Sequence, residues 1–135
     1  MRGLHLTADL RGCAADRAVM TETSALRDAC LAAVAAAGLT AVGELFHRFP
    51  GDSAPGQATP ASAGTTTASG ITGVVLLAES HLAVHTWPEL GAATLDVYVC
   101  NLGGRDNTAR AETLFAALVA AFSPAQVERH ALDRG

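Results

Sequence analysis

The first half of the chain combines strand and helix patterns. Residues 4–9 (LHLTAD) alternate apolar and polar side chains, which predicts a half-buried β-strand because successive strand side chains point to opposite faces. From residue 21 to 37 the apolar positions recur at helical spacing, which predicts a helix that Gly38 ends. Residues 40–49 (TAVGELFHRF) predict a second strand. The apolar positions of the predicted helix are Leu26, Cys30, Ala33, Val34 and Ala37.

The second half contains three more strand patterns and another helix. Residues 71–79 (ITGVVLLAE) and 81–87 (HLAVHTW) predict two strands, and residues 93–100 (ATLDVYVC) predict a third after a turn at residues 88–91. Asn107 and Thr108 cap the predicted helix, and residues 126–132 (QVERHAL) predict a closing strand. The helix has one apolar stripe, formed by Ala111, Leu114, Phe115, Leu118, Val119 and Phe122.

The segment between the two halves has a different composition. Residues 50–70 (PGDSAPGQATPASAGTTTASG) contain almost no bulky apolar side chain, so they bury too little surface to offset the entropy of ordering, and we predict a flexible loop. The order of elements predicts an α+β fold, a two-layer sandwich in which two helices pack on one face of a mostly antiparallel sheet. At 135 residues without a repeat, we expect a single domain over residues 1–135.

Composition and charge narrow the function classes. Hydrophobic residues make up 50% of the chain but aromatic residues only 4%, so the core must consist mainly of Ala, Val and Leu. A net charge of −4 argues against binding to nucleic acid or to an anionic membrane, because both need a basic patch. The chain contains no run of 18 apolar residues, so no membrane span is predicted. Residues 1–12 lack the apolar core of a signal peptide. With three widely spaced cysteines and no CxxC pair, we expect a cytoplasmic protein without disulfides.

Residues 76–89 (LLAESHLAVHTWPE) place chemically active side chains inside a strand pattern. His81 and His85 would share one strand face, but neither an HExxH motif nor a third ligand at a recognisable spacing accompanies them, so hydrogen-bonded sheet histidines are favoured over a metal site. Ser80 and a nearby histidine suggest a hydrolase, but the GxSxG turn is absent. Cys100 is either a small buried hydrophobe or a reactive thiol, depending on whether it faces the same cavity as Ser80 and His85.

Several of these motifs together resemble one family. FHRF (46–49), TGVV (72–75) and ESHLAVHTWPE (79–89), followed by Gly91, Asp96 and Cys100, are similar to the short prokaryotic S-adenosylmethionine decarboxylase proenzymes, which are pyruvoyl-dependent. The likeness extends from His5 to the last residues, apart from residues 50–70. Compared with the usual family pattern, residues 50–70 form a longer segment, and Leu90 and Ala92 replace aromatic residues.

The resemblance implies that the chain cuts itself. In relatives, the serine that matches Ser80 attacks the carbonyl of the preceding glutamate, here Glu79, and elimination then converts the serine into a pyruvoyl group. Residues 1–79 would become the β chain and residues 80–135 the α chain. The self-generated pyruvoyl group would be the only cofactor, because its carbonyl supplies the electron sink that decarboxylation requires.

The resemblance also implies roles for six further residues. His85 and Thr72 match residues that assist self-processing, and Cys100 matches the acid that protonates the decarboxylated carbon. The other three match the positions that hold the nucleoside: aromatic residues at Phe49 and Trp87, and a carboxylate for the ribose hydroxyls at Glu89.

The resemblance finally implies a substrate and a partner. We expect S-adenosylmethionine to be decarboxylated for spermidine biosynthesis, in an active site built between two protomers of a homodimer of αβ units. The alternatives are a decarboxylase of the same family that acts on L-arginine or L-ornithine, and an uncleaved regulatory paralogue without activity.

Overall fold

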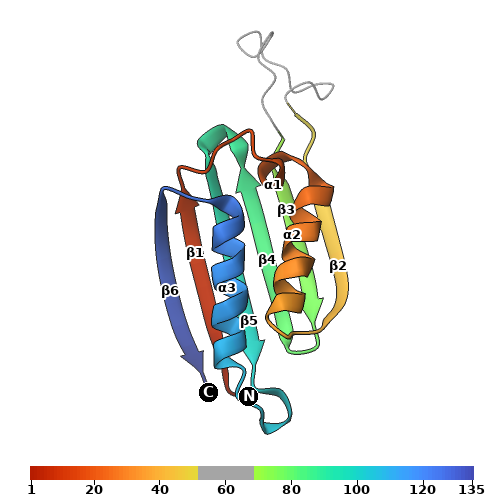
Figure 1. Ribbon diagram of the computed structural model, residues 1–135, viewed down its shortest axis with the longest axis vertical. Helices are drawn as coiled ribbons and strands as arrows, with labels where there is room; N and C mark the ends of the chain where they lie inside the picture. The colour runs from red at the N-terminus through yellow and green to blue at the C-terminus, as the bar shows by residue number, and fades with distance from the viewer. Residues whose placement is uncertain (52–68) are drawn as a thin grey trace.

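The computed structural model describes residues 1–51 and 69–135, so the flexible loop predicted at residues 50–70 lies almost entirely outside the described residues. Six strands, three α-helices and two short 3₁₀ turns make up the described parts (Figure 1). The strands are β1 (Gly3–Arg11), β2 (Ala41–Arg48), β3 (Ile71–Leu77), β4 (Ser80–Trp87), β5 (Ala92–Cys100) and β6 (Gln126–Arg134). The helices are α1 (Ala18–Thr21), α2 (Thr23–Ala36) and α3 (Thr108–Phe122), and the 3₁₀ turns are η1 (Pro88–Leu90) and η2 (Leu102–Gly104).

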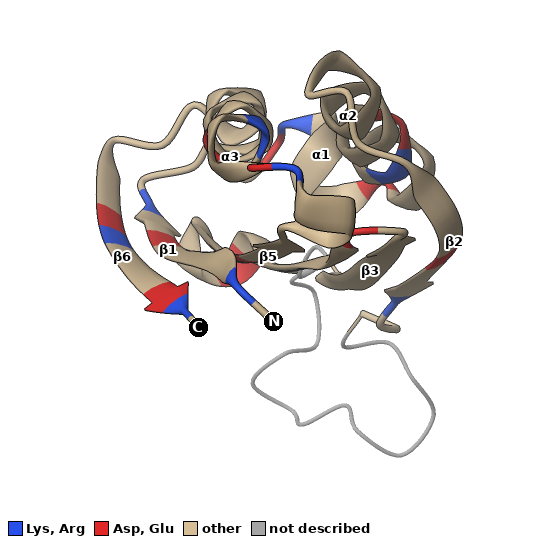
Figure 2. Cartoon of the chain, turned by 90° about the horizontal axis from the view of Figure 1, so that it is seen from below, with Lys and Arg blue, Asp and Glu red and all other residues tan. Residues whose placement is uncertain are grey.

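The six strands form one sheet in the order β2-β3-β4-β5-β1-β6, and every neighbouring pair is antiparallel. Both long helices, α2 and α3, lie on the same side of this sheet, as the end-on view shows (Figure 2). The predicted α+β two-layer sandwich is therefore confirmed. We call the other side of the sheet the open face, because none of these helices covers it.

Strand alternation separates the core from the open face. In β1, Leu6, Ala8 and Leu10 are buried, whereas Thr7 and Asp9, which alternate with them, are more exposed. The same alternation in β4 buries Leu82 and Val84 and leaves His85 on the open face. All members of the predicted stripe of α3 are buried in this core except Val119, which is only partly buried but also packs against it. The open face therefore carries the polar and aromatic side chains of the central strands.

Local details at three element ends differ from the predictions. A short helix, α1, precedes α2 and buries Met20, so the long helix begins at Thr23 and not at residue 21. The strand predicted over residues 71–79 ends at Leu77, which places Glu79 in the turn before β4. Asn107 precedes α3 but makes no side-chain cap. Its Nδ2 instead donates to the carbonyl of Cys100 at 2.9 Å, which ties the end of β5 to the start of α3.

Candidate active site

The turn between β3 and β4 is held tightly against the α2–β2 connection. The N–H of Ala78 donates to the carbonyl of Thr40 at 2.9 Å, and the N–H of Thr40 donates to the side-chain Oε2 of Glu79 at 3.2 Å. Glu79 is only 8% exposed, so its carboxylate is fixed in place and does not extend into solvent. Sequence reasoning did not identify Thr40, because its contribution comes from the backbone and has no side-chain signature.

The peptide bond between Glu79 and Ser80 combines a strained residue with a polarised carbonyl. Ser80 has φ of 143°, a region that L-residues other than glycine rarely adopt and that costs about 1–3 kcal/mol. The carbonyl oxygen of Glu79 accepts the N–H of Cys100 at 2.8 Å. A backbone donor already aimed at this oxygen stabilises the negative charge that develops when a nucleophile attacks the carbonyl. The arrangement therefore favours attack at this bond.

Cys100 ends β5 beside the Glu79 carbonyl and is 8% exposed. Gly3 lies opposite it in β1, where an added Cβ would come within 2.8 Å of the Cα of Cys100, so a glycine permits the close approach of the two strands. The other two thiols lie in the core. Burial raises the pKa of Cys13, and burial together with the nearby Glu44 carboxylate raises that of Cys30 to about 12. Neither is suited to proton transfer at neutral pH.

A second group of predicted residues lies where β3 and β4 pair near the other end of the sheet. Thr72 stands directly opposite His85, and the Thr72 Oγ1 lies 3.2 Å from the His85 Nδ1, within hydrogen-bond distance. The rings of His85 and Trp87 lie 6.0 Å apart on the same face. Between them, the buried Thr86 hydroxyl donates to the Met20 carbonyl at 2.8 Å and accepts the Ile71 N–H at 2.9 Å, which fixes this end of the strand pair to the core.

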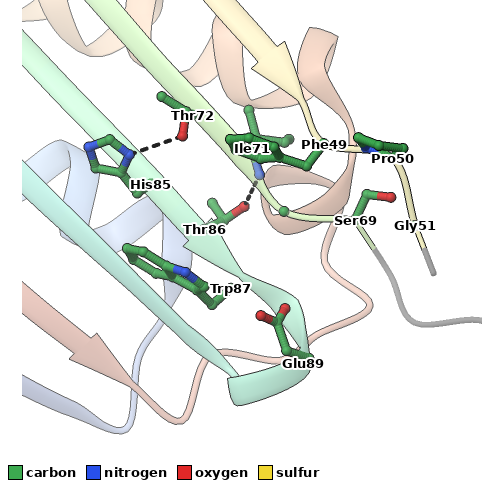
Figure 3. Close-up of a pocket in the computed structure, with 11 residues that line it drawn as sticks. Phe49, Pro50, Gly51, Ser69, Ile71, Thr72, His85, Thr86, Trp87 and Glu89 are labelled. Atoms are coloured by element: carbon green, nitrogen blue, oxygen red, sulfur yellow. Dashed lines mark hydrogen bonds between the residues drawn. The ribbon is translucent and has the colours of Figure 1, made fainter. Parts of the chain in front are cut away.

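These residues line a pocket of about 570 Å³ (Figure 3). Phe49, Trp87 and Glu89, the three residues expected to hold a nucleoside, all contribute to its wall together with Thr72 and His85. The volume falls within the range of roughly 300–1,000 Å³ that is usual for small-molecule sites. The pocket thus combines aromatic side chains, a carboxylate and a histidine, a combination suited to a flat, polar organic ligand.

The predicted site residues therefore form two separate groups. We call Glu79, Ser80 and Cys100 the cleavage end, and Phe49, Thr72, His85, Trp87 and Glu89 the pocket end. Ser80 begins β4, and His85 lies five residues further along it. At a rise of about 3.3 Å per residue, roughly 16 Å separates the two residues. Within one chain, His85 cannot reach Ser80.

Two further histidines of the open face, His5 and His81, form a third group around Asp96. His5 Nε2 lies 2.8 Å from Asp96 Oδ1, and His81 Nε2 lies 3.6 Å from the same oxygen. In the described parts of the chain, no three His, Cys, Asp or Glu residues are arranged to hold a metal ion. Within the same parts, no helix is long and apolar enough to cross a membrane.

Comparisons with known proteins point to one family. The family model described as S-adenosylmethionine decarboxylase matches residues 4–135. The chain is 33% identical over 133 residues to an S-adenosylmethionine decarboxylase proenzyme of Aquifex aeolicus, with 98% of this chain and 81% of the relative covered. It is 30% identical to the proenzyme of Archaeoglobus fulgidus, with coverages of 98% and 97%. The crystal structure of the adenosylmethionine decarboxylase from Aquifex aeolicus superposes with a TM-score of 0.76 at 32% identity, covering 98% of this chain and 90% of that one.

Proposed function

The chain belongs to the S-adenosylmethionine decarboxylase family, and on that basis we propose that it is a self-processing, pyruvoyl-dependent decarboxylase that cuts its backbone between Glu79 and Ser80. The observation that carries this proposal is the geometry of the cleavage end. Ser80 is strained at φ of 143°, and the carbonyl that it would attack is already hydrogen-bonded by the N–H of Cys100. Strain in the reactant and a donor at the developing charge both lower the barrier to attack.

Cleavage requires only the atoms of the chain itself and one water molecule. Ser80 Oγ bonds to the Glu79 carbonyl carbon, the C–N bond between the residues breaks, and the hydroxyl proton moves to the Ser80 nitrogen. A base then removes the α proton of residue 80, and Glu79 departs as a carboxylate that keeps the former Oγ. Water replaces the nitrogen, which leaves as ammonia. Residues 1–79 and 80–135 are then separate chains, and the second begins with the pyruvoyl group.

The residues of the cleavage end fit a carbonyl cofactor generated at position 80. When formed, the pyruvoyl group would supply the electron sink for decarboxylation of an amino acid bound through its amine. Ser80 is partly exposed at the start of the central strand β4, so a substrate could reach it, and Cys100 adjoins the same peptide bond. In this proposal the Cys100 thiol delivers a proton to the substrate carbon after carbon dioxide leaves.

We further propose that a second copy of the chain completes the site. His85 and Thr72 are too far from Ser80 of their own chain to assist it, and the open face on which they lie exposes Leu45 and Leu76. A two-fold axis perpendicular to the strands would stack two open faces and bring the cleavage end of each copy over the pocket end of the other. His85 of one copy could then remove the α proton at residue 80 of its partner.

The pocket end supports S-adenosylmethionine as the substrate. Phe49 and Trp87 offer aromatic faces to an adenine ring and a sulfonium, and Glu89 offers carboxylate oxygens to the ribose hydroxyls. Decarboxylated S-adenosylmethionine would supply aminopropyl groups for spermidine. The three free cysteines support a reducing compartment, the cytoplasm.

Release of labelled carbon dioxide from carboxyl-labelled substrates tests the substrate. We expect release from S-adenosylmethionine and, for Glu89→Gln, a raised KM because one ribose acceptor is weakened. Release from L-arginine or L-ornithine with none from S-adenosylmethionine would support the related decarboxylases instead. A chain that stays uncleaved and releases none from any of them would be the regulatory paralogue.

A further inference from the structure

A second cavity, of about 300 Å³, lies directly beside the cleavage end, where the β3–β4 turn faces the β5–α3 connection. It does not overlap the 570 Å³ pocket, which lies at the other end of β4. Its lining residues are Glu79, Leu102, Gly103, Arg105, Asn107 and Arg110. The residue whose carbonyl is attacked during cleavage therefore shares a cavity with two arginines.

Both arginines are positioned without an acidic partner in the described parts of the chain. Arg110 Nη1 lies 3.4 Å from Asn107 Oδ1, and its side chain lies against Gly38 at the end of α2. Across residues 1–51 and 69–135, neither Arg105 nor Arg110 is within ion-pair distance of a carboxylate. The adjacent Asp106 instead accepts hydrogen bonds from the side chain and the backbone N–H of Thr108, which lower its pKa.

The charges in this cavity are not balanced before cleavage. Two guanidinium groups and the Glu79 side chain leave one positive charge, and that side chain already accepts the Thr40 N–H. Cleavage converts the neutral carbonyl of Glu79 into a carboxylate at the same place. A carboxylate in a partly enclosed site is costly unless it is paired with cations and hydrogen-bonded.

We propose that this cavity, the carboxylate pocket, binds the C-terminal carboxylate that cleavage creates on Glu79, with Arg105 and Arg110 as the cations and the Cys100 N–H as a hydrogen-bond donor. This inference rests on the proposed self-cleavage. The bound carboxylate neutralises the pocket, and it anchors the end of residues 1–79 beside the new start of residues 80–135. The arginines thus stabilise the cleaved protein and contribute little to the uncleaved one.

Thermal unfolding of cleaved and uncleaved protein tests the carboxylate pocket. Arg105→Gln with Arg110→Gln is introduced into the wild-type chain and into a Ser80→Ala chain, which cannot cleave. Arg11→Gln is the matched control, since Arg11 is an exposed arginine at the opposite end of the sheet. Intact-mass spectra establish which proteins are cleaved before their Tm values are compared.

We expect the double variant to cleave and to lose about 4 °C more in Tm in the wild-type chain than in the Ser80→Ala chain. The excess should shrink in 1 M salt, which screens the pair, and Arg11→Gln should show no excess. Equal losses in the two backgrounds would overturn the inference while leaving self-cleavage intact.

Single variants cover the case in which the double variant fails to cleave, because the Tm comparison then proceeds with whichever single variant is cleaved. Failure of both single variants to cleave would also overturn the inference, because the arginines would then act on the uncleaved chain. An uncleaved wild-type chain would instead overturn the proposed function itself.

Discussion

Ser80 is one of only two non-glycine residues with a positive φ in the described parts of the chain, and it stands at the proposed cleavage bond. Its side chain was identified from the sequence by its place in ESHLAVHTWPE. The φ angle of Ser80 could not be predicted from the sequence. It depends on how Thr40 and Cys100, from elsewhere in the chain, hold Ala78 and Glu79. The identity of a reactive residue can be predicted from sequence here, but its strain cannot.

The strain at residue 80 predicts an inverted preference between alanine and glycine. Neither Ser80→Ala nor Ser80→Gly can cleave, and glycine tolerates the observed φ, so the glycine variant should be more stable by about 1 kcal/mol in urea unfolding. Ala83 provides the control in the same strand at an ordinary φ. There, Ala83→Gly in the Ser80→Ala background should lose about 0.5–1 kcal/mol. A Ser80→Gly chain that is less stable than Ser80→Ala would argue against strain.

Cys100 is expected to act through its backbone N–H during cleavage and through its thiol during turnover. A single substitution distinguishes the two roles. Cys100→Ala keeps the backbone N–H that contacts the Glu79 carbonyl, so cleavage should continue, but it removes the thiol, so turnover should fall by about 10²-fold or more. Cleavage is read by intact mass and turnover by release of carbon dioxide together with the amount of correctly protonated product. Cys13→Ala, which removes a core thiol, should retain turnover. Normal turnover in Cys100→Ala would refute the acid role.

Among the secondary-structure elements, β4 has the largest consequence for function. Its pleat places His81, His85 and Trp87 on the open face, as the strand pattern predicts, while Leu82 and Val84 enter the core. Its length also separates Ser80 from His85 by about 16 Å. The strand predicted over residues 81–87 was accurate enough to imply this distance. The family resemblance, however, assigned Ser80 and His85 to one reaction and carried no information on how far apart they lie. The two groups of site residues became distinct only in the structure.

The separation along β4 predicts that two inactive chains can restore cleavage when they are mixed. Ser80→Ala and His85→Ala chains, each expressed alone, should stay uncleaved or nearly so. When they are co-expressed at equal levels, random pairing gives mixed dimers in which His85 of the first chain faces Ser80 of the second. About half of the His85→Ala chains should then be cleaved, as read by intact mass of differently tagged chains. Absence of cleavage in the mixture, or full cleavage of His85→Ala alone, would contradict a shared site.

For the whole molecule, the main feature is the difference between the two sides of the sheet. The helical side is closed by α2 and α3, and the open face exposes apolar side chains on β2 and β3, with Leu45 at 69% and Leu76 at 50%. The two-layer architecture followed directly from the order of elements in the sequence. The need for a second copy could not be derived from the hydrophobic periodicity. A sheet face that binds another copy and a sheet face that stays in solvent show similar alternation of apolar and polar residues.

A charge on the open face should therefore prevent association. Leu76→Glu is expected to give a folded monomer by light scattering and circular dichroism, because a carboxylate would have to be buried without a partner in the dimer. It should also stay uncleaved, since Ser80 would lack the second copy. The control is Val127→Glu, which alters an exposed apolar residue of β6 paired with the core residue Leu10, and which should remain a cleaved dimer. A Leu76→Glu chain with the dimer mass would place the interface elsewhere.

The central claim is that this chain cuts itself at one bond to make its own cofactor, and an intact-mass spectrum of the purified protein tests it most directly. The account predicts two masses, one for residues 1–79 with a free carboxylate and one for residues 80–135 that is lighter by one ammonia than a serine-initiated chain. Borohydride reduction should shift only the second mass. A single full-length mass that persists through long incubation would contradict the account.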